Sequence, residues 1–221
     1  MFQVPTPEEF LVKAVVIAVM LLVAFPIHEF SHALAAYRLG DGTARLMGRL
    51  TLDPRAHFDP TGGVLLAVSI MFTGFGFGWA KPTPYNPMNL RGGHWGEAIV
   101  SAAGPLSNLV LAIAGAIPLR YIDATHMDIP LLGEFLSFFV YINLVLMIFN
   151  FIPIPPLDGS KVLFAFMSPR TVWQVRPVLE QYGLVILLAA LLLPIFPGGL
   201  TLTDLVFGNL LAPVFHLLTG R

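Results

Sequence analysis

The sequence predicts an all-α polytopic membrane bundle of about five transmembrane helices, with a small membrane-associated β or re-entrant element. The 221-residue chain is 56% hydrophobic and only 11% charged, with a mean hydropathy of +0.79. Soluble domains average roughly 45–50% apolar and 25% charged residues. Apolar runs of about 20 residues, enough to cross about 30 Å of hydrocarbon, also recur along the chain. We therefore expect one membrane-embedded domain over residues 1–221, without a second soluble domain.

Five apolar runs are long enough to be spans. The first is preceded by Glu8 and Glu9 rather than by basic residues, and no small-residue cleavage site follows it. We therefore expect a retained helix rather than a cleaved leader. The five predicted spans cover roughly residues 10–37, 97–119, 133–152, 179–197 and 200–218.

Two further segments do not fit the pattern of a spanning helix. Residues 44–52 alternate imperfectly between apolar and polar or glycine positions, which predicts a strand. Residues 63–79 are apolar but short and interrupted by glycines. That composition favours a re-entrant or strand-like hairpin over a spanning helix.

The distribution of Lys and Arg predicts the orientation, because cytoplasmic loops carry an excess of both. If 63–79 does not cross, only Arg120 lies on the other side and Lys13 lies within a helix. This predicts an outer N-terminus and a cytoplasmic C-terminus. The residues placed on the cytoplasmic side are Arg38, Arg45, Arg49, Arg55, Lys81, Arg91, Lys161, Arg170, Arg176 and Arg221.

Charge and cysteine content narrow the possible partners. The net charge is −1 and no long basic run is present, so we expect no nucleic-acid partner. The chain has no cysteine, which excludes disulfides and thiolate ligands. A bound metal ion must therefore be held by His, Asp or Glu side chains.

The first span contains an H-E-x-x-H sequence, from His28 to His32. Residues four apart lie on one helix face, so both imidazoles can reach one zinc ion, and Glu29 is placed to act as a general base. A catalytic zinc site needs a third protein ligand. The alternative is that both histidines are polar residues satisfied within the bundle. Ionisable residues in a membrane helix are costly and usually functional, which argues against that alternative.

Asp158 is the best candidate for the third ligand. It follows a run of prolines that ends the third long span and forces a non-helical path. Such a path is tolerated at membrane depth where it is buried in protein or lines a wet cavity. Asp158 and His32 share a side only if an even number of crossings separates them. With 63–79 re-entrant there are two crossings, and the charge count gives the same arrangement independently. Three rivals, which we expect to be solvated loop charges, are Asp41, Asp53 and Asp59.

Two long motifs together resemble the site-2 protease family of intramembrane zinc metalloproteases. The H-E-x-x-H is followed by N-x-x-P-x-P-x-L-D-G at 150–159, and GWAKPTPYNP (78–87) and AGPLSN (103–108) also look like segments of that family. The resemblance implies that one zinc ion is bound and that a catalytic base acts beside it. It further implies that Asn150 lines the site and positions the substrate or polarises its carbonyl. The implied zinc ligands are His28, His32 and Asp158, and the implied base is Glu29.

The resemblance also implies a substrate and a location. The family hydrolyses peptide bonds in or near transmembrane segments of membrane-protein substrates, often to release a regulatory factor. We therefore expect a multi-pass protein of the plasma or inner membrane, surrounded by the lipid bilayer, with its site open toward the cytoplasm. Many relatives carry an additional helix or PDZ or CBS domains. We expect this chain to be a single peptidase domain over 1–221, with neither domain.

Two other functions remain possible from the sequence. A transporter or channel could use the buried His and acidic residues as an ion or proton relay. A non-catalytic relative could bind membrane segments without cutting them, although it would have no need of Glu29 as a base. Asn108, in an apolar span, needs a hydrogen-bond partner, and we expect it to brace the fold rather than the site. His126 and Asp128 are spaced like a second metal pair but fall in the short outer loop.

Overall fold

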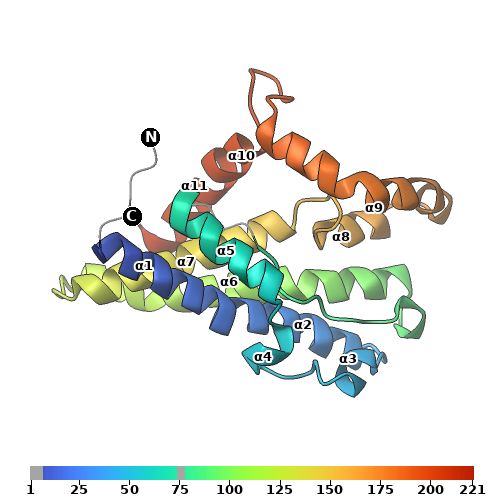
Figure 1. Ribbon diagram of the computed structural model, residues 1–221, viewed down its shortest axis with the longest axis horizontal. Coiled ribbons are helices and arrows are strands. Elements are labelled where there is room, and N and C mark those ends of the chain that lie inside the picture. Colours follow the sequence, from blue (N-terminus) through green and yellow to red (C-terminus); the bar gives the residue numbers. More distant parts are fainter. Residues whose placement is uncertain (1–6, 74–77) are drawn as a thin grey trace.

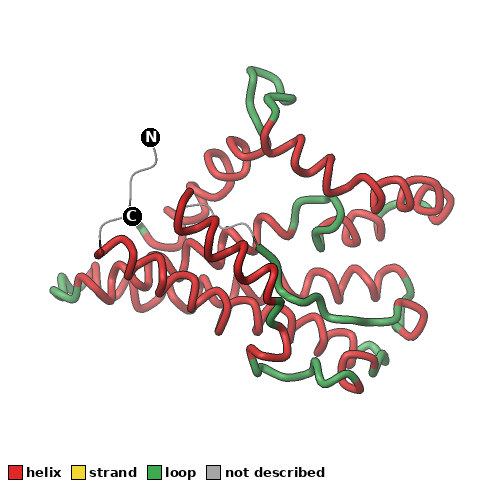
Figure 2. Tube along the Cα trace, viewed as in Figure 1, coloured by secondary structure: helices red, strands yellow, loops and turns green. Residues whose placement is uncertain are grey.

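Within the described residues, five helices have the length and apolar composition of membrane spans, as the apolar runs predict. The computed structural model describes residues 7–73 and 78–221. Figure 1 shows the elements in chain order and Figure 2 shows that helix dominates the described chain. The helices long and apolar enough to cross a membrane are Phe10–Arg38, His94–Ala124 (α6), Pro130–Asn150 (α7), Pro169–Leu192 (α9) and Leu202–Thr219. The first of these helices comprises α1 (Pro7–Val19), a π-helical turn (Met20–Ala24) and α2 (Phe25–Arg38). The last comprises α10 (Leu202–Asp204), a second π-helical stretch (Leu205–Leu211) and α11 (Ala212–Thr219).

The predicted strand at 44–52 is wrong. Residues 43–46 form a helical turn, α3 (Thr43–Leu46), and within 7–73 and 78–221 the only β-type pairing is one isolated bridge, Phe196–Leu200. Asp41 causes the difference, because its carboxylate accepts hydrogen bonds from the backbone N–H (3.3 Å) and hydroxyl (2.7 Å) of Thr43. Gly48, with φ of 69°, follows the turn. The alternating pattern therefore belongs to a helical turn and loop.

The remaining short helices are α4 (Pro54–His57), α5 (Pro60–Thr73), a 3₁₀ turn (Pro87–Asn89) and α8 (Gly159–Ala165).

The segment predicted to be a re-entrant or strand-like hairpin begins as helix α5. Its 14 residues extend about 21 Å at 1.5 Å per residue, less than the hydrocarbon thickness. Leu66 and Ile70 pack with Met20 and Ala24 in a buried apolar cluster, so burial against the first span stabilises the helical form. Residues 74–77 lie outside the described residues. Beyond them, the chain returns to the start of α5, because a Cβ atom at Gly62 would lie only 2.1 Å from the carbonyl oxygen of Trp79.

Helix α6 lies at the centre of the bundle, between α2 and α7 (Figure 1). Its small residues allow close contact with α7, since Ala112 and Ala116 share a buried cluster with Val140 and Leu144. The core of the molecule is therefore the α6–α7 interface. Two fully buried amides, described below, lie in this same interface.

The two ends of the bundle differ, and the C-terminus lies at the end away from His32. Arg221 donates to Asp123, near the end of α6, over 2.6 and 2.8 Å. Helix α9 instead begins at the other end, where Arg176 donates to Glu97 of the first turn of α6 over 2.9 and 3.0 Å. Figure 1 shows α9 and the segment with α10 and α11 joined at an angle. Together they pass once along the length of the bundle.

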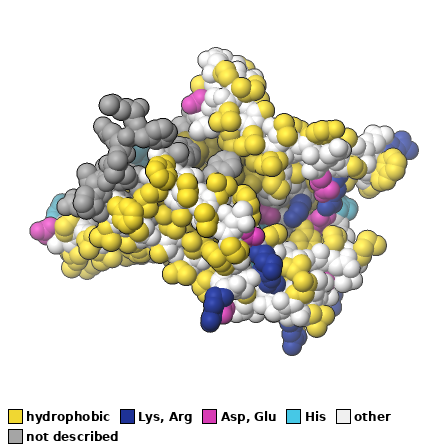
Figure 3. All heavy atoms as spheres, viewed as in Figure 1, with side chains coloured by type: hydrophobic (Ala, Val, Ile, Leu, Met, Phe, Trp, Pro, Cys, Tyr) yellow, Lys and Arg dark blue, Asp and Glu magenta, His cyan; other side chains and the backbone are white. Residues whose placement is uncertain are grey.

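This path places the C-terminus at the same end of the bundle as the 125–129 loop. An outer loop at 125–129 and a cytoplasmic C-terminus cannot both hold, because Arg221 lies beside that loop. The expectation treats each long apolar run as a full crossing, whereas the last two helices are joined at an angle and together run the length of the bundle. The charge asymmetry between the two ends of the bundle remains large. Nine of the ten Lys and Arg residues predicted to be cytoplasmic lie at the end that carries His32, and Arg221 lies with Arg120 at the opposite end. In the face shown in Figure 3, apolar side chains cover α1 and α5, while most Lys and Arg side chains gather toward the end where α2 and α3 lie.

Candidate metal centre

The paired histidines lie in α2, immediately after the π-helical turn. Pro26 has no backbone N–H, so the regular helical bonding is interrupted there, and the N–H of Phe25 donates to the carbonyl of Met20. Ordinary α-helix follows, which places His28 and His32 one turn apart on the same face. Both are buried, with 6% of their surface exposed. Their rings are 4.7 Å apart and nearly perpendicular.

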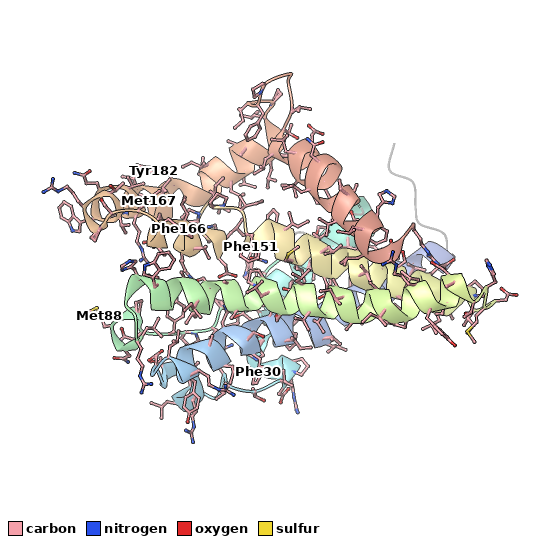
Figure 4. The ribbon with its side chains drawn as sticks, turned by 180° about the vertical axis from the view of Figure 1, so that it is seen from behind. Phe30, Met88, Phe151, Phe166, Met167 and Tyr182 are labelled. Atoms are coloured by element: carbon pink, nitrogen blue, oxygen red, sulfur yellow. The ribbon has the colours of Figure 1, made fainter. Side chains whose placement is uncertain are left out.

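Asp158 reaches the same point from a non-helical segment between α7 and α8. Figure 4 labels Phe151 where α7 ends and Phe166 where α8 ends, and the segment between them lies between α6 and α9. Gly159 lets this segment fold closely, since a Cβ atom there would lie 2.2 Å from the carbonyl oxygen of Phe151. The prolines and Gly159 together hold Asp158 as the last residue before α8.

The structure brings the three predicted ligand residues together. The two Nε2 atoms of His28 and His32 are 3.0 Å apart. Oδ2 of Asp158 lies 3.3 Å from Nε2 of His28 and 3.2 Å from Nε2 of His32. Among the described residues, these form a group whose ligand atoms could hold one metal ion. A tetrahedral zinc ion with bonds of about 2.0 Å separates its ligand atoms by about 3.3 Å, so the spacing fits zinc.

The outer ring nitrogens show that the converging atoms are free to bind a cation. Nδ1 of His32 lies 2.7 Å from the carbonyl oxygen of Val100, which can only accept, so this nitrogen carries the proton. Nδ1 of His28 lies 2.6 Å from Oδ1 of Asn108. With both protons outward, two Nε2 lone pairs and a carboxylate oxygen face one another. A cation at the centre stabilises such a cluster of acceptors, and a zinc ion supplies that charge.

Gly104 of α6 forms the wall of this cluster. A Cβ atom at this position would lie 2.3 Å from Nε2 of His32 and 2.6 Å from Nε2 of His28. Gly104 was not identified as a site residue from the sequence. Its position within AGPLSN was the signal that it belonged to the site.

Glu29 is held by the extended segment that follows α5. The backbone N–H of Thr83 donates to Oε2 of Glu29 (2.7 Å), and the Thr83 hydroxyl donates to the Glu29 carbonyl (2.9 Å). Asp41 anchors the next part of the segment, accepting from the backbone N–H of Asn86 and the side-chain amide of Asn89 (2.9 Å each). Asp41 is therefore buried and structural, rather than the solvated loop charge expected. Its pKa reflects this: burial alone would raise it, but hydrogen bonds from Asn89, Thr43 and Asn86 outweigh burial and lower the pKa.

Other polar residues separate into those at the site and those elsewhere. Asn108 contacts His28 directly, which corrects the expectation that it braces only the fold. The side-chain amide of Asn150 donates to the carbonyl of Leu146 in its own helix (2.9 Å), at the end of α7 that leads to Asp158. His126 and Asp128 lie in the loop after α6, at the end that carries Arg221.

Comparison with known proteins finds relatives that carry the name of zinc metalloproteases. The profile of Peptidase family M50 matches residues 113–193, a stretch that includes Asp158. The chain is similar to "Putative zinc metalloprotease YwhC" of Bacillus subtilis (strain 168), with 37% identity over 184 residues and 81% of each chain covered. It is also similar to "Putative zinc metalloprotease Rip2" of two mycobacteria. Identity is 32% over 178 residues for Mycolicibacterium smegmatis (strain ATCC 700084 / mc(2)155) and 32% over 183 residues for Mycobacterium tuberculosis (strain ATCC 25618 / H37Rv).

The extent of these matches differs between relatives. The match covers 78% and 80% of this chain but only 65% and 66% of the two Rip2 proteins, slightly less than two thirds of their length. No solved structure gives a significant match.

Proposed function

The chain belongs to peptidase family M50, the site-2 protease family of membrane zinc metallopeptidases, and from this premise we propose that it cuts membrane-protein substrates in or near their transmembrane segments. One observation carries the proposal: three acceptor atoms, from His28, His32 and Asp158, meet within 3.0–3.3 Å beside a held carboxylate, Glu29. A site at the end of apolar spans suits a substrate that reaches it through the bilayer.

The proposed zinc ligands are His28, His32 and Asp158, with one ion per chain. When bound, zinc lowers the pKa of a water molecule and polarises the peptide carbonyl. The Val100 carbonyl and Asn108 hold the two imidazoles with their Nε2 lone pairs directed inward. Gly104 leaves room beside those two nitrogens.

Glu29 is the proposed general base. It takes a proton from the attacking water as the oxygen bonds to the peptide carbonyl carbon. The carbon–nitrogen bond then breaks, and Glu29 passes the proton to the leaving amine. Thr83 fixes one carboxylate oxygen through its backbone N–H, which leaves the other oxygen for the water.

Asn150 is proposed to position the substrate or polarise its carbonyl. One of its two amide N–H groups donates to the Leu146 carbonyl. The second amide N–H and the amide oxygen remain available for a substrate backbone. Release of a regulatory factor from the membrane is the proposed outcome of cleavage.

We propose that the end of the bundle carrying His32 faces the cytoplasm of the plasma or inner membrane. The support is the gathering of Lys and Arg at that end, which persists after Arg221 is assigned to the other. The segment from α5 to Trp79 is proposed to be re-entrant, because it leaves and rejoins the same end and α5 is too short to cross.

The test is cleavage by the full chain in liposomes, with a transmembrane substrate and a Glu29→Gln control. Wild-type protein should cut the substrate, and Glu29→Gln should leave it intact, because a base is required. A relay or channel would instead show His28-dependent ion flux without hydrolysis. A non-catalytic relative would bind the substrate without cutting it, equally well with Glu or Gln at position 29. An uncut substrate with the wild-type protein would therefore refute the proposal.

A further inference from the structure

We propose that Asn143 of α7 is a positioning residue for the metal centre, which acts through Asn108 on the orientation of His28. This inference rests on the proposed function, because it concerns how one of the proposed zinc ligands is held. Asn143 touches none of the three ligand residues by any hydrogen bond that the structure gives it. Its effect on the site must pass along a chain of hydrogen bonds.

The chain runs across the α6–α7 interface. Nδ2 of Asn143 donates to the carbonyl oxygen of Phe139, one turn earlier in α7 (2.9 Å). Nδ2 of Asn108 donates to Oδ1 of Asn143 (3.1 Å). Oδ1 of Asn108 then faces Nδ1 of His28 at 2.6 Å. Both asparagines are fully buried, with 0% of their surface exposed, so no water competes for these groups.

The Phe139 carbonyl, at one end of this chain, determines which group donates and which accepts in every hydrogen bond along it. A backbone carbonyl such as that of Phe139 can only accept, so the Asn143 amide must turn its NH₂ group toward it. Asn143 then presents its oxygen to Asn108, whose NH₂ group must turn toward that oxygen. This leaves the Asn108 oxygen facing His28, so Nδ1 of His28 carries the proton and Nε2 keeps its lone pair.

A simpler role for the pair would be to hold α6 and α7 together, as buried amides do in membrane bundles. Two features exceed that role. The chain continues past the helix interface to a ring nitrogen, and its polarity selects the one tautomer of His28 that can bind a cation through Nε2. His32 reaches the same tautomer through a single backbone carbonyl, that of Val100, and so needs no such chain.

The test measures zinc affinity of the purified full chain by competition with a chromophoric chelator, together with the melting temperature of the zinc-free protein. The variants are Asn143→Leu, Asn143→Ser, Asn108→Leu and the double leucine variant. Thr219→Val is the matched control, because the buried Thr219 hydroxyl also donates to a carbonyl one turn earlier, that of Phe215, but far from the site.

Asn143→Leu should lower zinc affinity about 10- to 100-fold, the usual cost of removing a group that orients a metal ligand. Asn143→Ser should recover part of the loss, because a hydroxyl can both donate and accept. The double variant should be no worse than Asn108→Leu alone, and Thr219→Val should bind zinc as wild type does.

A purely structural role gives a different pattern. Asn143→Leu would then lower the melting temperature but bind zinc with wild-type affinity, or its loss would add to that of Asn108→Leu. Either result would overturn the inference while leaving the zinc site in place. If Asn143→Leu does not fold, the same comparison is made with Asn143→Ser. Absence of zinc binding by the wild-type chain would refute the proposed function itself, and this inference with it.

Discussion

Gly104→Ala adds one methyl group to the wall of the metal centre. The new Cβ atom would lie 2.3 Å from Nε2 of His32 and 2.6 Å from Nε2 of His28. Non-bonded atoms prefer a separation of about 3.5 Å, so these nitrogens would have to move about 1 Å. Neither ring can swing away freely, because each Nδ1 atom is hydrogen-bonded, to Val100 and Asn108 respectively. Metal–ligand distances tolerate only about 0.2 Å.

Gly104→Ala should therefore lower zinc affinity at least about 100-fold, the upper end of what indirect perturbations cost, because it displaces the ligands themselves. The assay is chelator competition on the purified chain. Alanine favours a helix over glycine by about 0.5–1 kcal/mol, so the zinc-free variant should still fold.

Gly115→Ala is the matched control on the same helix. Its Cβ atom would lie 2.8 Å from the ring of Phe139 in α7, away from the ligands and on the side chain rather than the carbonyl that Asn143 uses. This variant should lose stability but keep zinc affinity. The reasoning is refuted if Gly104→Ala binds zinc as wild type does, or if both variants lose zinc equally.

Three further predictions address the groups around the centre. Thr83→Val removes the hydrogen bond from the Thr83 hydroxyl to the Glu29 carbonyl and should lower kcat about 5- to 10-fold, the equivalent of about 1–1.4 kcal/mol. KM should be unchanged and Thr83→Ser should recover the rate. An unchanged kcat would show that the hydroxyl does not position the base. Gly159→Ala should displace Asp158 and release zinc, because the added Cβ atom would lie 2.2 Å from the Phe151 carbonyl oxygen. Retention of zinc, measured as zinc content, would mean that the segment between α7 and α8 can shift without moving Asp158. Asp41, whose pKa is lowered in the folded state, stabilises the fold above its unfolded pKa of about 3.9, and this contribution is lost as pH falls through the lower folded value. Asp41→Asn should flatten the dependence of unfolding on acid pH, measured by thermal melts, and an unchanged slope would contradict the assignment.

Much of the fold follows from local sequence, because a span needs only length and apolar composition. Helix α9 begins at Pro169, about ten residues before its apolar run, because the Ser168 side chain caps it and Pro169 suits the first turn. The predicted strand at 44–52 was wrong, because Asp41 accepts a hydrogen bond from Thr43 at the start of a helical turn there. The end of the bundle at which the C-terminus lies could not be derived from the sequence, because the angle between α9 and the last helical segment is set by packing.

The site was predictable to the extent that its residues form motifs. His28 and His32 are related by helical periodicity, and Asp158 by the proline-rich break that follows α7. The supporting groups were not predictable in the same way. Asn108 could be identified as a buried amide in need of a partner, but the identity of that partner depends on how α2 and α6 pack.

The central claim is that the His28, His32 and Asp158 side chains bind one zinc ion beside a separate base, Glu29. The most direct measurement is the zinc content of the purified full chain, compared with Asp158→Ala and Glu29→Gln. We expect close to one zinc ion per chain in the wild type and in Glu29→Gln, and little in Asp158→Ala. Wild-type zinc content in Asp158→Ala, or none in the wild type after incubation with zinc, would contradict the account.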